Sequence, residues 1–116
     1  MSESIQPARG FAEVNGAKLF YEVTGAGHPF VLLHEGIADS RMYDDQFHAF
    51  AQHYRVVRFD IRGFGQSDLP PRDASVALYE DLNGLLAFLG IKKTYVLGMS
   101  MGGAIALDFT LAHPAM

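Results

Sequence analysis

Three short apolar runs constrain the fold of this 116-residue chain more than any other feature. Residues 30–33, 56–59 and 95–97 are largely apolar and do not alternate with polar residues. Runs of this kind are typical of strands buried on both faces of a sheet. Helix-like segments separate the three runs. The alternation predicts an α/β fold, with βαβ units and a parallel sheet covered by helices on both faces.

The segments between and after the runs carry apolar residues at helical spacing. The first places four aromatic side chains on one stripe, at Tyr43, Phe47, Phe50 and Tyr54. The second places five leucines on another, at Leu78, Leu82, Leu85, Leu86 and Leu89. Gly90 is suited to cap the second helix at its C-terminus. A third helix is expected to start after Ser100 and to stop at His113 and Pro114.

A β-hairpin is predicted ahead of the first apolar run. Residues 11–14 and 17–23 flank Asn15 and Gly16, a pair that tolerates the positive φ angles of a type I′ turn. Residues 1–9 are polar and are expected to form a flexible N-terminus. The length of the chain then leaves one domain, residues 10–116.

Composition argues against several classes of function. The formal net charge is −4 and the basic residues are scattered, so neither nucleic acid nor an anionic membrane is an expected partner. The absence of cysteine excludes a disulfide framework, a thiolate zinc site and a cysteine nucleophile. No apolar run approaches the roughly 18 residues of a membrane helix. We therefore expect a cytoplasmic protein without a metal or cofactor.

Polar and glycine-rich segments follow each of the three apolar runs, at residues 34–36, 60–65 and 98–102. In a parallel sheet the carboxyl ends of the strands lie at one edge, where ligands bind. The three segments are therefore expected to converge.

Ser100 is the candidate nucleophile. It is the serine of a Gly-x-Ser-x-Gly pattern between a strand and a helix, which is typical of a nucleophile elbow. Such a turn lifts the hydroxyl clear and directs the amide of Met101 outward at a helix N-terminus, where a developing oxyanion is stabilised. The alternative is a glycine-rich turn that only lets strand and helix pack closely.

The segment His34-Glu35-Gly36 is interpreted as the source of a second oxyanion donor, the amide of Gly36. The alternative is an ordinary turn. His34 is expected to have a structural or oxyanion-side role, and a Ser100–His34 dyad is the less favoured hypothesis. Residues 62–68 lack the third glycine of a dinucleotide-binding loop and are interpreted as a structural turn.

Together, LLHEG, FDIRGFGQSD, DLNGLLAFLGI and VLGMSMGGAIALDFTLAHP resemble the N-terminal half of the α/β-hydrolase family, in the order of that family and from residue 11 to residue 114. The motifs look most like those of bacterial esterases, enol-lactonases and cofactor-free perhydrolases. The resemblance implies strand order 1-2-4-3-5, with Ser100 as the nucleophile and the amides of Met101 and Gly36 as oxyanion donors. Glu35 departs from the second position of the usual His-Gly loop and would bring a negative charge near the oxyanion.

In the family the catalytic acid and histidine follow the nucleophile, in a C-terminal half that is absent here. The resemblance therefore implies a serine hydrolase acting on carboxylic esters, with a base from a partner chain, from His34 or from a histidine of a second subunit. The strand from Thr94 to Met99 would become an exposed apolar edge, prone to pair with another chain. We expect a homodimer through this edge, or a complementing C-terminal chain. The alternative function is a non-catalytic truncated domain that serves as a folding or assembly module.

Overall fold

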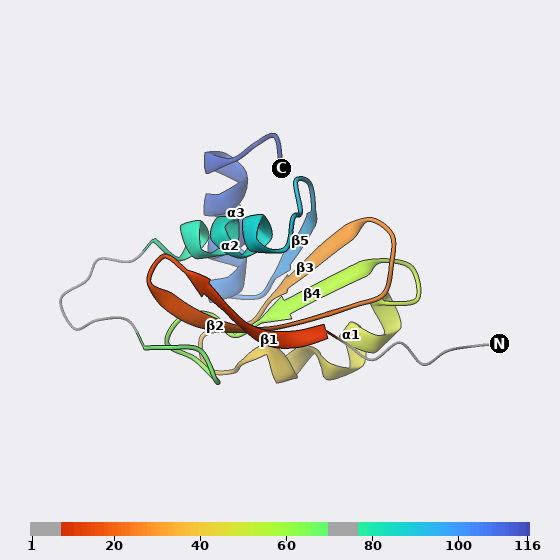
Figure 1. Ribbon diagram of the computed structural model, residues 1–116, viewed down its shortest axis with the longest axis horizontal. Coiled ribbons are helices and arrows are strands. Elements are labelled where there is room, and N and C mark those ends of the chain that lie inside the picture. The colour runs from red at the N-terminus through yellow and green to blue at the C-terminus, as the bar shows by residue number, and fades with distance from the viewer. Residues whose placement is uncertain (1–7, 70–76) are drawn as a thin grey trace.

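The computed structural model describes residues 8–69 and 77–116, which form a five-stranded sheet with helices on both faces (Figure 1). The strands are β1 (Ala8–Val14), β2 (Ala17–Thr24), β3 (Pro29–Leu33), β4 (Arg55–Phe59) and β5 (Tyr95–Gly98). The helices are the 3₁₀ helix η1 (Ser40–Tyr43), α1 (Asp44–Phe50), α2 (Leu78–Phe88) and α3 (Met101–Ala112).

The strand order is β1-β2-β4-β3-β5, as the resemblance predicted. β3 lies between β4 and β5 and runs parallel to both, whereas the hairpin β1–β2 joins β4 in antiparallel orientation. Leu33 is paired with Gly98, so β3 and β5 end at the same edge. The α/β fold is therefore confirmed, and the segments after β3 and β5 begin side by side.

The hairpin turn has the predicted geometry. Asn15 and Gly16 have φ angles of 49° and 83°, the two consecutive positive values of a type I′ turn. Ala8 and Arg9 already belong to β1, so this strand begins inside the segment expected to be flexible. The rest of that segment, residues 1–7, lies outside the described residues.

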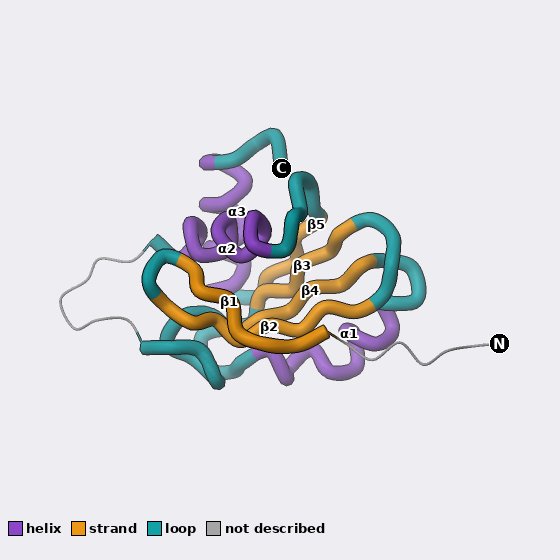
Figure 2. Tube along the Cα trace, viewed as in Figure 1, coloured by secondary structure: helices purple, strands orange, loops and turns teal. Residues whose placement is uncertain are grey.

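Helices cover the two faces of the sheet unequally (Figure 2). α1 packs against β4 on one face, and α2 and α3 lie together on the other. The larger core lies beneath α2 and α3 and includes Leu82, Leu85, Ile105 and Phe109, all buried. The smaller core joins Tyr43 and Phe47 to β3 and β4. No helix in residues 8–69 and 77–116 is long and apolar enough to cross a bilayer.

The first helix is shorter than its aromatic stripe predicted, because α1 ends at Phe50. The chain must enter β4 at Arg55, whose N–H donates to the carbonyl of His28 at 3.1 Å. A tight turn connects α1 to β4, and in it the N–H of Tyr54 donates to the carbonyl of Phe50 at 2.9 Å. Tyr54 still packs edge-on against Phe30 at 5.3 Å, so the turn delivers it to the same core.

The second helix ends as predicted. Gly90 has a φ of 71° and its N–H donates to the carbonyl of Ala87, while Ile91 donates to Leu86. These two bonds form a Schellman motif, which satisfies carbonyls that the helix leaves free.

Candidate active site

Ser100 lies between β5 and α3 in a backbone conformation that is rare for an L-residue. Its φ of 54° and ψ of −114° fall outside the regions open to ordinary side chains, and its side chain is exposed. A non-glycine residue held in this way costs on the order of 1–3 kcal/mol and persists only where the surroundings fix it. The strained turn expected of a nucleophile elbow is therefore present in the fold.

The two glycines of the pattern allow the backbones on either side of Ser100 to approach closely. A Cβ atom on Gly98 would overlap the carbonyl of Gly102, and one on Gly102 would overlap the carbonyls of Leu33 and His34. α3 therefore begins directly on the end of β3. Larger residues at either position would push the serine away from the loop after β3.

Gly36 and Met101 lie next to each other, although they are far apart in the chain. A Cβ built on Gly36 would lie 3.6 Å from both the Cβ and the Sδ of Met101. Met101 is the first residue of α3, so its N–H has no acceptor within the helix. Among the described residues, neither its N–H nor that of Gly36 meets a hydrogen-bond acceptor. Within residues 8–69 and 77–116, two backbone donors next to the exposed serine thus have no acceptor.

His34 is fully buried, and both of its ring nitrogens are engaged. The backbone N–H of Ile61 donates to Nε2 at 2.9 Å, and Nδ1 lies 2.8 Å from the carbonyl oxygen of Glu35. The ring also meets Phe64 edge-on, with 5.4 Å between centroids. These contacts occupy the nitrogen lone pair that a general base would need.

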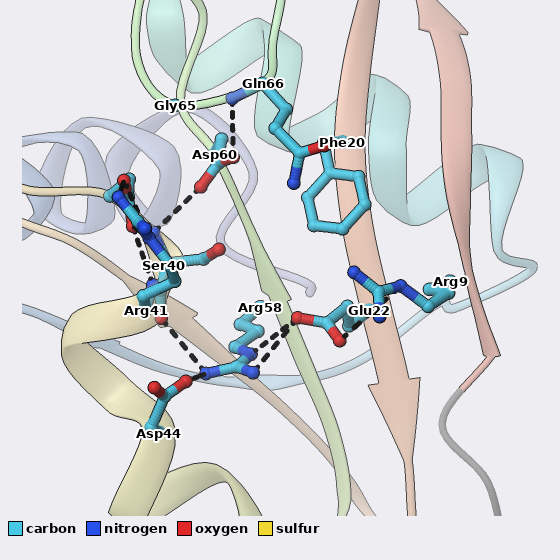
Figure 3. Close-up of a pocket in the computed structure, with 11 residues that line it drawn as sticks. Arg9, Phe20, Glu22, Ser40, Arg41, Asp44, Arg58, Asp60, Gly65 and Gln66 are labelled. Atoms are coloured by element: carbon cyan, nitrogen blue, oxygen red, sulfur yellow. Dashed lines mark hydrogen bonds and ion pairs between the residues drawn. The ribbon is translucent and has the colours of Figure 1, made fainter.

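The turn after β4 is held by the carboxylate of Asp60. Its oxygens accept from the N–H of Ser40 at 2.8 Å and from the N–H of Gln66 at 2.9 Å (Figure 3). The structure thus gives residues 62–68 the architectural role that was expected of them. Asp60 joins this turn to the loop after β3, a link that sequence spacing did not reveal.

Sequence reasoning also missed a polar cavity of about 390 Å³ beside this turn. Arg58 points between Glu22 and Asp44, with donor–acceptor distances of 3.1 Å and 2.6 Å, and also donates to the carbonyl of Ser40 (Figure 3). Arg58 and Glu22 come from neighbouring buried strands. Each arginine of the wall lies within 4.0 Å of a carboxylate, and the Asp60 carboxylate accepts from backbone N–H groups, which is typical of a structural network.

Tyr43 supports the end of β3 from the other face of the sheet. Its buried hydroxyl donates to the carbonyl of Leu33 at 2.9 Å. Burial raises the pKa of the Tyr43 phenol, and the negative charge of Glu35 raises it further.

On the exposed loop beside it, the side-chain hydrogen bond from Arg41 lowers the pKa of Asp39, the N-cap of η1.

The other four histidines lie away from Ser100. The ring of His28 is tilted against that of Tyr95 at the start of β5, with 4.2 Å between centroids. His53 lies at the same end of the sheet, beside Gly27. His113 follows α3, so about 18 Å of helix separates it from Ser100. It is 2.7 Å from Glu80.

His48 is exposed on α1, across the sheet from α3 (Figure 1). Within residues 8–69 and 77–116, no three acidic or histidine side chains converge as metal ligands would.

A sequence profile described as alpha/beta hydrolase fold matches residues 29–115. This chain belongs to the alpha/beta hydrolase fold family. An uncharacterized protein of Mycobacterium tuberculosis is 36% identical over 112 residues, which cover 95% of this chain and 33% of the relative.

Two solved structures show the same fold. The epoxide hydrolase CorEH has a TM-score of 0.89 and 28% identity, over 96% of this chain and 40% of its own. The enol-lactonase of Burkholderia xenovorans LB400 has a TM-score of 0.86 and 32% identity, over 91% of this chain and 43% of its own. The alpha/beta hydrolase chain described here spans about a third of the length of the mycobacterial relative. The family and these relatives identify a hydrolase fold.

Proposed function

We propose that this chain carries the nucleophile and the oxyanion donors of a serine esterase, which acts on carboxylic esters or related acyl compounds. The observation that carries the proposal is the strained, exposed Ser100 beside the free amides of Gly36 and Met101. The likeness to an enol-lactonase, named for a cyclic ester, favours the same class of substrate.

In the proposed reaction the Oγ of Ser100 attacks the ester carbonyl carbon and forms a C–O bond. The π electrons of the carbonyl move to its oxygen, and the N–H groups of Met101 and Gly36 donate to that oxyanion. Collapse of the tetrahedral intermediate expels the alcohol and leaves an acyl-serine, which water then hydrolyses. The serine proton passes to a base outside the described part of this chain, since His34 has no free ring nitrogen. That base gives the proton to the departing alcohol oxygen, then takes one from the attacking water and returns it to Ser100 as the acid is released.

The chemistry of a serine nucleophile argues for esters over epoxides, despite the likeness to CorEH. A serine that opened an epoxide would be left as an ether, which water does not cleave, and the site would not turn over. An acyl-serine is an ester and is released by water.

The cysteine-free composition is compatible with the cytoplasm, where we place the chain in this proposal.

Turnover of 4-nitrophenyl acetate tests the proposal against a non-catalytic folding or assembly module. Slow turnover is expected from the chain alone, because oxyanion donors without a proper base give only part of the rate enhancement. Ser100→Ala is expected to reduce that rate at least tenfold. Thr110→Ala, which removes an exposed hydroxyl from the same helix, is the control and leaves the rate unchanged. Equal rates for wild type and Ser100→Ala would favour the non-catalytic module.

A further inference from the structure

The hydrogen bonds of His34 define which nitrogen carries its proton. A backbone N–H can only donate, so Nε2 of His34, 2.9 Å from the N of Ile61, must be the unprotonated nitrogen. Nδ1 therefore carries the proton and donates to the carbonyl of Glu35 at 2.8 Å. The two hydrogen bonds thus hold the ring in one tautomer and engage both of its nitrogens.

The carbonyl of Glu35 receives a second hydrogen bond, from the N–H of Ala38 at 3.2 Å. Two donors thus fix the plane of the peptide that joins Glu35 to Gly36. The described residues contain no cis peptide bond, so the N–H of Gly36 points opposite to that carbonyl and away from the imidazole. On the side of Gly36 lies Met101, the first residue of α3.

The other nitrogen of His34 ties the ring to the rigid part of the fold. Ile61 is the second residue after β4 and is buried. The carboxylate of its neighbour Asp60 accepts from the N–H of Ser40, the first residue of η1, where the loop after β3 ends. The imidazole therefore bridges the end of β4 and the peptide that presents Gly36.

We propose that His34 is a positioning residue for the oxyanion site. Its Nδ1–H holds the Glu35 carbonyl and so directs the Gly36 N–H at the space beside Ser100, while Nε2 anchors the ring on Ile61. This inference rests on the proposed function, because it gives that N–H an oxyanion to bind. It replaces the hypothesis of a Ser100–His34 dyad with a role in which His34 never exchanges its proton during the reaction.

Two substitutions test the two hydrogen bonds of His34 separately. In His34→Asn the side-chain amide keeps a donor close to the position of Nδ1, and loses the acceptor for Ile61. In His34→Gln the longer side chain can accept from Ile61 but cannot donate to Glu35. Removal of an oxyanion donor costs about 10²–10³ in rate in a well-studied protease, so a misdirected donor should cost about tenfold or more.

The first readout is the affinity for phenylboronic acid, which forms a tetrahedral adduct on a nucleophilic serine without turnover. We expect wild type and His34→Asn to bind it within about threefold of each other, and His34→Gln to bind it at least tenfold more weakly. The Gly36 amide proton should shift on addition of boronate in wild type and not in His34→Gln. His48→Gln, on the exposed face of α1, is the control and binds as wild type does.

The outcomes distinguish this inference from the function on which it rests. Boronate binding that is equal in wild type and His34→Gln would overturn the positioning role and leave the esterase proposal standing. No binding by wild type would overturn both. A second measurement needs no variant: in wild type, NMR should show a protonated Nδ1 and a scalar coupling between the Ile61 N–H and Nε2. A protonated Nε2 would overturn the inference.

Discussion

At Ser100 the backbone holds an L-residue where glycine would fit without strain. The cost of this conformation is offset by the close contact of Gly98 and Gly102 with their neighbours, which fixes the path of the chain. Glycine at this position would make the fold more stable, whereas a nucleophile requires a side chain. The two requirements should therefore separate when residue 100 is varied.

We expect Ser100→Gly to raise the free energy of unfolding by about 1 kcal/mol relative to Ser100→Ala, because glycine relieves the strain and alanine does not. Urea unfolding of both variants measures the difference. Ala104→Gly is the control, since Ala104 lies in the regular part of α3, where glycine should destabilise by about 1 kcal/mol. Equal stability of the two variants at residue 100 would show that the turn is not strained.

The stability of the fold should depend on pH through the buried phenol of Tyr43. Folding raises the pKa of its phenol above the ordinary value of 10.0, so the folded state holds the proton more tightly than the unfolded state. This contribution to stability is fully present below about pH 10 and is lost as the pH rises further. Tyr43→Phe should be less stable by about 1 kcal/mol at neutral pH, and its stability should fall less between about pH 9 and 11.

Urea midpoints across that range, for wild type and Tyr43→Phe, test this expectation. Tyr79→Phe is the control, because it removes a different phenol and should keep the wild-type slope. Parallel curves for wild type and Tyr43→Phe would contradict the role of this buried hydroxyl.

The candidate site shows what single-residue patterns can predict. Glycine spacing placed Ser100 on a strand-to-helix turn, because only glycine permits the contacts on either side of it. The position of Gly36 beside Met101 followed from the strand order that the family resemblance implied. The hydrogen bonds of His34 could not be predicted, because its partner Ile61 is 27 residues away and bonds through its backbone.

At the scale of elements, a buried ion pair joins the turn after β4 to α2. Nε and Nη2 of Arg62 each lie 2.8 Å from an oxygen of Asp81. Nη2 also donates to the carbonyls of Val14 and Asn15, at the hairpin turn. Both charged side chains are almost completely buried, so loss of either one leaves an unpaired charge in the interior.

We expect Asp81→Asn to destabilise the fold by about 3–5 kcal/mol, because the charge of Arg62 would remain buried. The double variant Arg62→Met/Asp81→Leu should cost clearly less than the sum of the single variants. A double-mutant cycle by urea unfolding measures the coupling. For comparison, Arg41→Met breaks an exposed pair and should cost less than about 1 kcal/mol. Additive single effects at Arg62 and Asp81 would contradict the coupling.

Element types were predictable where periodicity and turn chemistry agreed. The hairpin and the end of α2 follow from Asn15-Gly16 and Gly90, whose conformations are local properties. The end of α1 was not predictable, because Tyr54 has the spacing of the stripe and lies in the same core without being helical. The path of the chain into β4, a tertiary constraint, ends that helix.

At the scale of the whole molecule, β5 is the exposed element. Among the described residues it pairs only with β3, so its outer edge has unpaired backbone groups. Tyr95 and Leu97 of β5 are 55% and 37% exposed, and Met99, directly after the strand, is 49% exposed. Leu107 and Leu111 of α3 are exposed as well. Apolar side chains around an open strand edge favour association.

We propose that a second copy of this chain pairs through β5. Two antiparallel β5 strands would form one continuous sheet, with the exposed leucines of the two α3 helices on the same face. The purified chain should elute at about twice its mass of 12.7 kDa. Leu97→Lys should shift it to the monomer, whereas Phe88→Lys, on α2, should not. A monomeric wild type, or a dimer indifferent to Leu97→Lys, would contradict this pairing.

If the fold makes Ser100 a nucleophile, a reagent that bonds covalently to activated serines should label it only in the folded chain. The chain is treated with a fluorophosphonate, in buffer and in denaturing urea, and the modified residue is identified by peptide mass spectrometry. We predict one phosphonyl group on Ser100 in the folded chain and none in urea, because the elbow and its amides exist only in the fold. Absence of label, label on another residue, or equal label in urea would contradict the account.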